Sequence, residues 1–246
     1  MWFRKIKKPI IALAPMFGYS NKSFRLKCRR AGADAVFTEM VAAEAIIRNI
    51  EKAWQMCEFD ERERPVIIQI FSNNPSAAAQ ASRAISSELH PDGIDINFGC
   101  PVQKAAKQGF GSILLNNLDL SSSIIKAVVS ETDLPVSVKM RLPTKKISDT
   151  VSFVEMAREA GVSLISIHGR TQTQKYGKHS DWELIHKVKE KFKHLPILGN
   201  GDIESLQDLK DKIGNLDGAL IGRAAKRDYH IFEKLSLIKS EITQPK

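Results

Sequence analysis

One cysteine stands where a side chain could take part in chemistry. Cys100 lies in the run NFGCP (residues 97–101), directly after the apolar segment Gly93–Asn97. A thiol in a loop that follows a buried strand can donate a proton to a substrate, or become a thiolate nucleophile when a cation lies beside it. The sequence leaves both roles open. Cys28 and Cys57 lie in helical patterns and are expected to be small buried side chains.

Polar side chains recur at the same kind of place, the end of a short apolar run. Such groups are costly to bury unless they meet partners or a ligand. Because every run end contributes some, they point to one large polar ligand. The polar residues are Thr38, Glu39, Gln69, Asn97, Lys139, Arg141, His168, Arg170, Asn200, Asp202 and Arg223, and the run ends also contain Pro15, Met16, Phe17, Gly201 and Gly222.

Lys139 and His168 each have two interpretations. Lys139 lies inside an apolar run, where it forms a structural ion pair with Glu39 or another carboxylate, or serves as a fixed cation beside a ligand that becomes anionic. His168 is either a hydrogen-bonded core residue or part of the site. The residue types alone do not decide between them.

Small residues end the last two apolar runs. GNGD (residues 199–202) and IGR (residues 221–223) place backbone N–H groups there, an arrangement typical of phosphate sites in barrel proteins. Arg223 can add a bidentate contact to a phosphate. The alternative is that these glycines only make tight turns.

Eight apolar runs rich in Ile and Val alternate with helical patterns. Such runs are typical of parallel strands buried on both faces. Eight units in 246 residues give about 31 residues each, the size expected of a (β/α)8 TIM barrel. An open doubly wound sheet would have fewer strands, and no G-x-G-x-x-G follows the first run. The expected strands are Ile10–Ala14, Ala33–Thr38, Val66–Phe71, Gly93–Asn97, Val136–Met140, Val162–His168, Ile197–Asn200 and Gly218–Ile221.

The segments between these runs have apolar residues at helical spacing. Asn74 and Pro75 predict the start of one helix, and Gly32 and Gly161 stand where C-terminal caps belong. In a barrel the run ends meet at one mouth. The other expected helices are Leu118–Glu131, Ser148–Ala160, Asp181–Lys193, Ser205–Lys212 and Lys226–Lys239.

The composition excludes several classes of protein. With 43% hydrophobic and 26% charged residues, the chain is neither disordered, collagen-like nor a disulfide scaffold. Three cysteines without a C-x-x-C pair predict reduced thiols in the cytoplasm and no metal site. No run reaches the roughly 18 apolar residues of a membrane helix. The net charge of +9 indicates a polyanionic partner.

The motifs together resemble those of the tRNA-dihydrouridine synthase family. They are, in order, APMFGYSNKSFR, FTEM, QIF, DINFGCP, GFGSILL, VSVKMR, HGRT, YGKHSDW, GNGD and IGRAA. The resemblance covers about residues 10 to 232. It implies a barrel that binds FMN and reduces specific uridines in tRNA, and it rests on the combination of motifs rather than on any one of them.

The resemblance implies a role for each matching residue. Cys100 would be the catalytic acid, and Asn97 would face the target base. Gln69 would hydrogen-bond the flavin ring, with Lys139 at its pyrimidine side and His168 nearby. The flavin would be lined by Pro15, Met16 and Phe17, and its ribityl phosphate held by Asn200, Gly201, Asp202, Gly222 and Arg223. Arg141, Arg170, Tyr176 and Trp182 match family positions around the pocket, and the resemblance assigns them no defined role.

The implied chemistry agrees with the residue types. NADPH would reduce FMN, and hydride would pass to C6 of a uracil while a proton reaches C5. Lys139 would stabilise anionic reduced flavin. A stacked uracil must leave its helix to be reached, and counterion release accounts for the positive charge. Four basic clusters either contact tRNA or are simply solvated surface. They are Arg4–Lys8, Lys22–Arg30, Lys104–Lys107 and Lys187–Lys193.

We expect residues 1–246 to form one catalytic barrel domain, with a last helix and short tail over residues 224–246, acting as a cytoplasmic monomer. Family members commonly carry a helical RNA-binding domain after the barrel, which this chain is expected to lack. Phe17 and residues 19–21 also depart from the family pattern. Two other hypotheses stay open: an FMN-dependent reductase of a free pyrimidine or small enone, like dihydroorotate dehydrogenase, and a non-catalytic RNA-binding barrel.

Overall fold

Parallel strands surrounded by helices make up the computed structural model, which describes residues 1–174, 177 and 179–241. The strands are β1 (Ile10–Leu13), β2 (Val36–Phe37), β3 (Val41–Ala42), β4 (Val66–Phe71), β5 (Gly93–Phe98), β6 (Val136–Leu142), β7 (Leu164–Thr171), β8 (Ile197–Asn200) and β9 (Gly218–Ile221). The helices are η1 (Trp2–Lys5), α1 (Lys22–Arg30), α2 (Ala43–Ile47), α3 (Glu51–Cys57), η2 (Glu61–Glu63), α4 (Pro75–Leu89), α5 (Gln103–Lys107), η3 (Gly111–Asn116), α6 (Leu118–Val129), α7 (Ile147–Glu159), α8 (Trp182–Lys191), α9 (Leu206–Ile213), α10 (Arg223–Arg227), α11 (Ile231–Ser236) and α12 (Ile238–Glu241).

Eight of the strands close into a barrel. Their order is β2-β1-β9-β8-β7-β6-β5-β4, and β2 pairs with β4 to complete the ring. All the pairings are parallel, so the expected (β/α)8 barrel is confirmed and the open sheet is excluded. The short strand β3 pairs with β4 at Ile70 and Phe71, beyond the β2 contacts at Val66 and Ile67. It therefore continues the second strand position after a break.

The expected elements differ from the observed ones most at the second strand and at the last helix, and β7 begins two and ends three residues later than the expected strand Val162–His168. The second strand is only two residues long, and β3 was not expected. The last helix, expected as one element over Lys226–Lys239, is divided into α10, α11 and α12. The break between α10 and α11 has a local cause, because Asp228 adopts an extended conformation and its carboxylate accepts the His230 N–H at 3.0 Å. Asp side chains compete with helical backbone bonds in this way.

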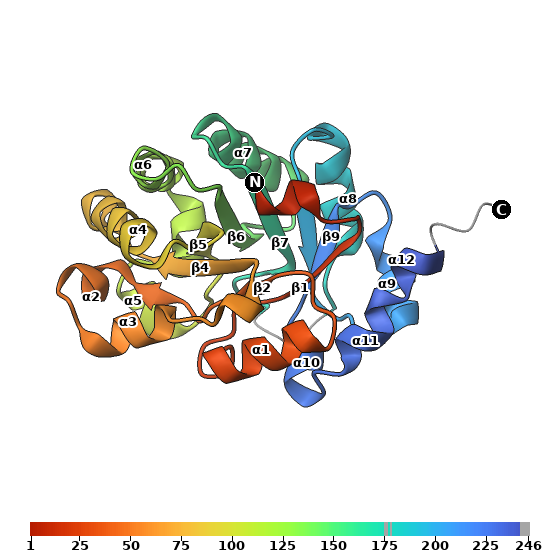
Figure 1. Cartoon of the computed structure of the whole chain (residues 1–246). Helices are drawn as coiled ribbons and strands as arrows, with labels where there is room; N and C mark the ends of the chain where they lie inside the picture. The colour runs from red at the N-terminus through yellow and green to blue at the C-terminus, as the bar shows by residue number, and fades with distance from the viewer. Residues whose placement is uncertain (175–176, 178, 242–246) are drawn as a thin grey trace.

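The barrel interior is apolar at the end where the strands begin. Alternate residues of each strand face inward, and the first inward positions are filled by Ile10, Ile67, Leu164 and Leu198. Helix η1 closes this end: Trp2 packs edge-on to Phe37, with ring centroids 6.3 Å apart. Figure 1 shows η1 in front of the strands. The polar inward positions must therefore lie nearer the opposite end.

Three aspartates brace the closed end of the barrel. Each stands just before a strand and accepts the N–H of a residue at the start of the neighbouring strand. Asp34 accepts from Ile11 at 2.7 Å, Asp92 from Val66 at 2.8 Å, and Asp217 from Ile197 at 2.8 Å. In barrels of this type, this end contributes stability rather than chemistry.

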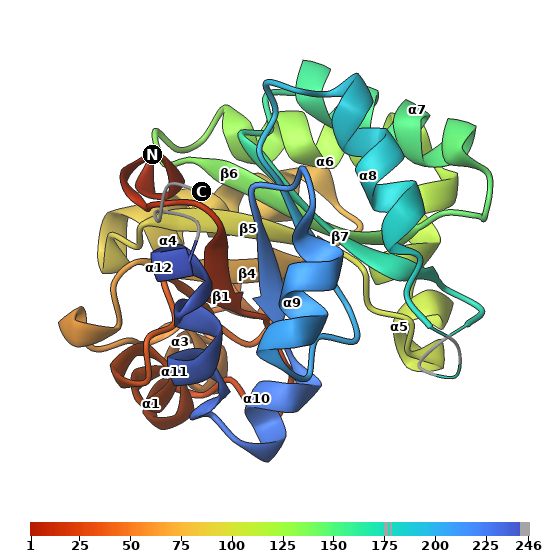
Figure 2. The same ribbon diagram turned by 90° about the vertical axis from the view of Figure 1, so that its right-hand side faces the viewer.

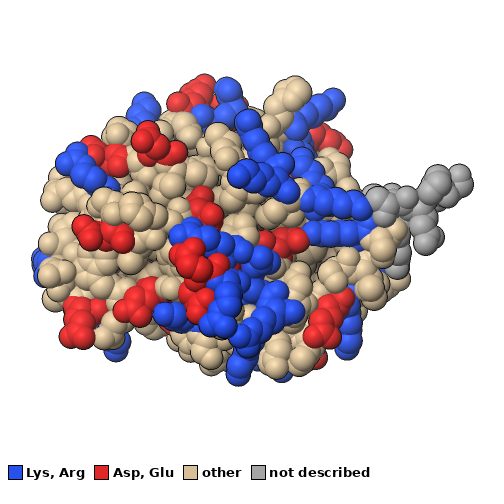
Figure 3. Space-filling model, in the orientation of Figure 1, with Lys and Arg blue, Asp and Glu red and all other residues tan. Residues whose placement is uncertain are grey.

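Several residues of the expected basic clusters are engaged within the protein. Figure 3 shows Lys and Arg across the closed end, with acidic side chains among them. Lys8 and Lys189 both pair with Asp217. Arg25 is fully buried, and its guanidinium lies 2.7 Å from Glu63. The clusters Arg4–Lys8, Lys22–Arg30 and Lys187–Lys193 are thus not uniformly available to a partner, because part of their charge stabilises the fold.

Candidate active site

The polar inward residues lie one or two pleats above the apolar layer. Gln69 lies beside Asp95 in the β4–β5 register, and Asn97 lies beside Lys139 in the β5–β6 register. The alternation that turns Ile67 inward also turns Gln69 inward, two residues further on. The carboxyl ends of the strands therefore form a polar mouth. In Figure 2 it lies towards α5, away from the N-terminus and α12.

A chain of hydrogen bonds runs from the barrel interior to Cys100. Asp95, fully buried, accepts from Ser137 Oγ at 2.5 Å and from Gln69 Nε2 at 2.7 Å. Gln69 Oε1 accepts from Asn97 Nδ2 at 2.9 Å. Asn97 Oδ1 then accepts the backbone N–H of Cys100 at 2.9 Å. Burial raises the pKa of Asp95 to about 6, although Gln69 and Ser137 both favour its charged form.

The Cys100 loop is held from two further sides. Its carbonyl accepts from Ser112 N at 3.0 Å and from Ser112 Oγ at 2.9 Å. Arg141 Nε donates to the Gly99 carbonyl at 3.0 Å. Gly111 has a φ of +75°, and a Cβ there would lie 2.8 Å from the Cys100 oxygen. The loop can therefore approach η3 closely only because residue 111 is glycine. Cys100 is 9% exposed.

The other two cysteines lie away from this loop and are fully buried. Burial raises the pKa of both the Cys28 and the Cys57 thiol to about 12. They are packing residues, as expected.

Lys139 is a half-buried cation at the mouth. Among the described residues its ammonium group has no hydrogen-bond or ion-pair partner, so the ion pair with Glu39 or another carboxylate, one of the two interpretations above, does not form there. Glu39 accepts the Gly18 N–H instead. Burial, with the nearby charge of Arg141, lowers the pKa of Lys139 to about 8. The residue is still mainly protonated at neutral pH and can meet an acceptor or an anion.

Arg170 determines the tautomer of His168. Arg170 Nη1 lies 3.1 Å from His168 Nε2. Because a guanidinium only donates, Nε2 is the acceptor and the ring proton is on Nδ1. Burial and the positive charges of Lys139 and Arg141 lower the pKa of His168 far below its usual value. The imidazole is therefore a neutral donor rather than an acid.

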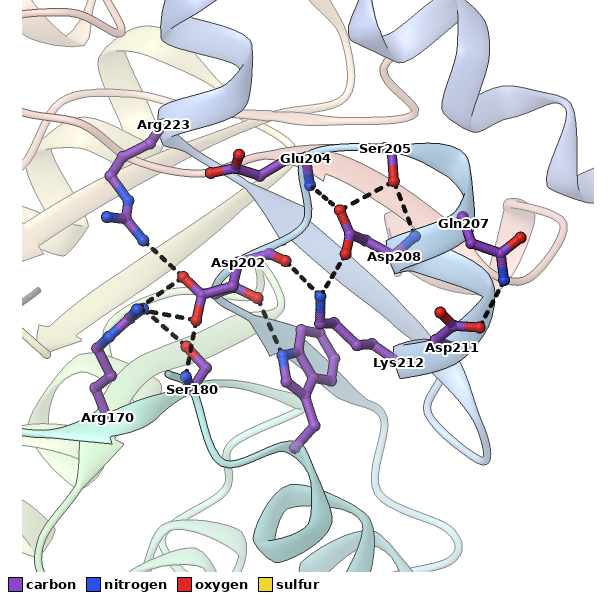
Figure 4. Close-up of polar contacts among 12 residues, drawn as sticks. Arg170, Ser180, Asp202, Glu204, Ser205, Gln207, Asp208, Asp211, Lys212 and Arg223 are labelled. Carbon is purple, nitrogen blue, oxygen red and sulfur yellow. Dashed lines mark hydrogen bonds and ion pairs between the residues drawn. The ribbon is translucent and has the colours of Figure 1, made fainter. Parts of the chain in front are cut away.

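Asp202 connects the ends of β7, β8 and β9. It accepts from Arg170 Nη2 at 2.7 and 2.9 Å, from Arg223 Nη2 at 2.7 Å and from Ser180 N at 2.8 Å, as Figure 4 shows. Lys212 Nζ donates to its carbonyl at 2.6 Å. Burial alone would raise its pKa, but the Ser180 N–H and Arg170 bonds leave the pKa of Asp202 lowered.

A hollow of about 390 Å³ opens beside this cluster. Cations from three elements line it, namely Arg170 on β7, Lys212 on α9 and Arg223 on α10, together with three carboxylates, Asp202, Glu204 and Asp208. The arginine expected as a phosphate clamp, Arg223, is thus paired with a carboxylate here. A phosphate entering this hollow would compete with Asp202 for the two arginines and with Asp208 for Lys212.

The remaining candidate residues lie around the same mouth. The Met16 N–H donates to Ser20 Oγ at 2.9 Å, which fixes the loop after β1, and Phe17 is 66% exposed. Asn200 donates to the Leu220 carbonyl at 2.7 Å. Pro15 and Gly222 follow β1 and β9, and Gly201 and Trp182 are in contact, since Trp182 Nε1 donates to the Gly201 carbonyl at 3.0 Å. Tyr176 lies outside the described residues.

The structure adds residues that sequence reasoning missed. Asp95 and Ser137 lie at inward strand positions, where alternation with Asn97 and Lys139 could have indicated them. Ser180 and Lys212 carry no such signal, since a loop residue and a helix residue reach Asp202 only in the folded chain. Two expected pocket residues, Arg141 and Arg170, are 2% and 3% exposed and bond mainly to the chain itself.

Hydrogen-bond donors predominate among the groups that face the mouth. Gln69 and Asn97 each retain one N–H beyond the bonds above, and the Lys139 ammonium group and the His168 Nδ1–H have no hydrogen-bond partner among the described residues. Such a site fits a ligand rich in acceptors, such as a heterocycle with several carbonyl groups that becomes anionic on reduction. Within the described ranges there is no group of three or more His, Cys, Asp or Glu residues suited to a metal, and no helix long and apolar enough to cross a membrane.

Comparisons with known proteins point to one family. The model of the family "Dihydrouridine synthase (Dus)" matches residues 12–246. The chain is 39% identical over 233 residues to a probable tRNA-dihydrouridine synthase of Aquifex aeolicus, which covers 93% of this chain and 73% of that protein. It is 34% identical over 228 residues to tRNA-dihydrouridine synthase B of Pseudomonas aeruginosa, which covers 92% and 68% of the two chains.

Proposed function

Because the chain belongs to the dihydrouridine synthase family, we propose that it reduces the C5–C6 double bond of a uridine in tRNA, using FMN as cofactor and NADPH as electron donor. The observation that best supports this proposal is the donor-lined mouth. The buried carboxylate of Asp95 accepts one N–H of the Gln69 side-chain amide. Lys139, Asn97 and His168 offer further hydrogen-bond donors near Gln69. The flavin ring and the uracil base both carry carbonyl acceptors.

The residues present fit both ends of FMN, the flavin ring at the barrel mouth and the phosphate at the adjacent hollow. Lys139 has no partner of its own among the described residues, and it would meet the ring together with Gln69 and His168. The cations of the adjacent hollow, with the backbone of Gly201 and Gly222, suit a phosphate. Asn200 and Asp202 would lie along the ribityl chain, and residues 15–17 would border the ring. When bound, FMN reduced by NADPH supplies the hydride that C6 of the uracil receives.

Cys100 is the proposed proton donor to C5. Negative charge that develops over C5 and O4 of the uracil can be relieved by one proton from the thiol, which leaves a thiolate that solvent reprotonates. His168 is not suited to this step, because its pKa is lowered and the ring is neutral. Lys139 and the free Asn97 N–H stabilise charge on carbonyl oxygens instead. The nucleophilic role for Cys100 is not needed.

The substrate base must leave its stack to reach this mouth. Exposed cations on the loops and helices after β5, β6 and β9 suit the phosphate backbone around it: Lys104, Lys107, Lys145, Lys146 and Lys226. Binding by such groups releases counterions and weakens with salt. We infer that residues 1–246 form one catalytic barrel domain and that it works in the cytoplasm, where tRNA is modified.

Two measurements test this function. The purified protein should show the visible absorption of a bound flavin. With NADPH it should raise the mass of one tRNA nucleotide by two hydrogen atoms, while free uridine and dihydroorotate-like compounds stay unchanged. Turnover of a free pyrimidine but not of tRNA would contradict the proposal and favour the small-molecule reductase. Salt-dependent tRNA binding without any flavin would favour the non-catalytic barrel.

A further inference from the structure

We propose that Asp95 is a positioning residue that sets the hydrogen-bond direction of Gln69 and Asn97 and thereby holds the loop of Cys100. This inference rests on the proposed function for its role in uridine reduction. It rests on the structure alone for its effect on the Cys100 loop. Asp95 does not take part in the mechanism described above, although it is a fully buried ionisable group inside the barrel.

The direction follows from the chemistry of each group in turn. An ionised carboxylate only accepts hydrogen bonds, so the Gln69 amide must present Nε2 to Asp95, at 2.7 Å. Its Oε1 then points to Asn97, which must present Nδ2, at 2.9 Å. Asn97 Oδ1 is thereby left for the N–H groups of Gly99 and Cys100, at 3.1 and 2.9 Å. One carboxylate thus fixes two amides that could otherwise turn by a half rotation.

The same direction determines what the mouth offers to a ligand. Each amide oxygen accepts from within the chain, Asn97 Oδ1 twice and Gln69 Oε1 once, and each amide keeps one N–H for the mouth. A reversed chain would present amide oxygens to the carbonyl groups of a ligand and would turn the Asn97 amino group towards the Cys100 N–H. Two donors would then face each other, and the loop would lose its anchor on β5.

Burying a carboxylate costs free energy, and two amides could be held without one. The presence of Asp95 therefore supports a functional role for this side chain. Its surroundings consist of Gln69 on β4, Ser137 on β6, and Lys139 as the nearby charge. Burial raises the pKa of Asp95, yet the group is still mainly ionised at neutral pH. Perturbed ionisable groups of this kind concentrate at functional sites.

The test compares three variants of the full chain. Asp95→Leu removes the anchor. Asp95→Asn keeps an amide oxygen that can accept from Gln69 while its amino group meets Ser137. Ser137→Ala removes the other partner of Asp95 and leaves the chain to Cys100 in place. For each variant, flavin reduction by NADPH and transfer to tRNA uridine are measured separately. The alkylation rate of Cys100 is measured in protein stripped of flavin, where Cys28 and Cys57 are buried internal controls.

In Asp95→Leu, transfer to uridine should fall roughly ten- to a hundredfold, the range for losing a hydrogen bond to a charged group. Flavin reduction should fall by less than about fivefold, because other donors remain. Cys100 alkylation should become about fivefold faster as its loop loosens. Asp95→Asn should recover most of both losses, and Ser137→Ala should resemble wild type.

Equal losses in both half-reactions with unchanged alkylation would indicate a merely structural role and overturn the proposal, as would unchanged transfer to uridine. If the wild type binds no flavin and reduces no uridine, the proposed function fails, and the alkylation rates still decide the inference. In that case equal rates in wild type and Asp95→Leu would overturn it, and faster alkylation in Asp95→Leu alone would support it.

Discussion

Asn97 and Cys100 are joined by a hydrogen bond of 2.9 Å from the cysteine N–H to the asparagine side-chain oxygen. The bond closes a tight turn at the carboxyl end of β5, so that the backbone of Cys100 is anchored to that strand. Ser112 on η3 holds the carbonyl of the same cysteine. A proton donor held from both sides keeps its geometry when a base arrives, which favours rapid transfer.

The contact between Gly111 and Cys100 gives the first prediction. Gly111→Ala should reduce transfer to uridine far more than flavin binding, because the new Cβ would lie 2.8 Å from the Cys100 oxygen and push the loop away. Gly18→Ala is the matched control: its φ of +77° resembles the +75° of Gly111, but no atom lies within 4 Å of its Cβ. Both variants should lose about 1 kcal/mol from backbone strain. Equal activity in the two would show that the contact is unimportant.

Asp95 should make the protein less stable at alkaline than at acidic pH. Its pKa is 3.8 in the unfolded chain and about 6 in the fold. The folded state therefore binds the extra proton, and the stability that this proton contributes is present below about pH 4 and lost as pH rises through about 6. Asp95→Asn carries no such cost and should be more stable than wild type at pH 8, by about 3 kcal/mol at most. The gain should vanish near pH 4.

Chemical unfolding at both pH values measures this difference. A gain in stability that accompanies some loss of uridine transfer would be the trade-off expected of a functional buried charge. A wild type that is the more stable of the two at pH 8 would show that the partners of Asp95 outweigh its burial.

Lys139 should impose an alkaline limit on flavin reduction. Its pKa is lowered to about 8 by burial and by Arg141, so the cation that stabilises a developing anion is lost as pH rises through that value. Stopped-flow reduction by NADPH from about pH 7 to about pH 10 should show the decline. Lys139→Arg should abolish the decline, because arginine stays charged, and Lys139→Met should be slow throughout. A decline that persists in Lys139→Arg would assign it to another group.

Asp202 should stabilise the fold in neutral solution and lose this effect in acid. The Ser180 and Arg170 bonds lower its pKa below the value of 3.8, so its contribution is present above that value and is lost as pH falls through the lowered pKa. Asp202→Ala leaves the buried Arg170 without this carboxylate and should cost about 3 kcal/mol at pH 7. Asp208→Ala, which removes a more exposed ion pair, should cost less than about 1 kcal/mol. If Asp202→Ala and Asp208→Ala lost similar amounts of stability, the Asp202 cluster would contribute no more than an exposed ion pair does.

Much of the fold could be predicted because its signals are local. Strands such as VIIQIF are apolar on both faces, and helix starts at Asn74, Asp181 and Ser205 carry side chains that accept the backbone N–H groups of the first turn. The break at Asp228 and the short β3 could not be predicted in this way. The break depends on the hydrogen bond between Asp228 and His230, and β3 depends on its pairing with β4, neither of which the apolar pattern reports.

The candidate site was predictable as a set of positions but not as a network. Parallel strands place Gln69, Asn97, Lys139 and His168 at one mouth whatever their partners are. The sequence did not reveal that Asp95 orients the amides, or that Asp202 already engages Arg223. Those relationships join residues far apart in the chain, 26 positions for Gln69 and Asp95 and 21 for Asp202 and Arg223, and they depend on strand register and loop packing.

The most direct test of the account is a single turnover of Cys100→Ala beside wild type, with each protein reduced by NADPH, mixed with tRNA, and the tRNA digested for mass spectrometry. We predict that both proteins bind flavin and accept electrons. Only the wild type should convert a uridine to a nucleotide heavier by two hydrogen atoms. Dihydrouridine formed at the wild-type rate by Cys100→Ala would contradict the assignment of the proton donor.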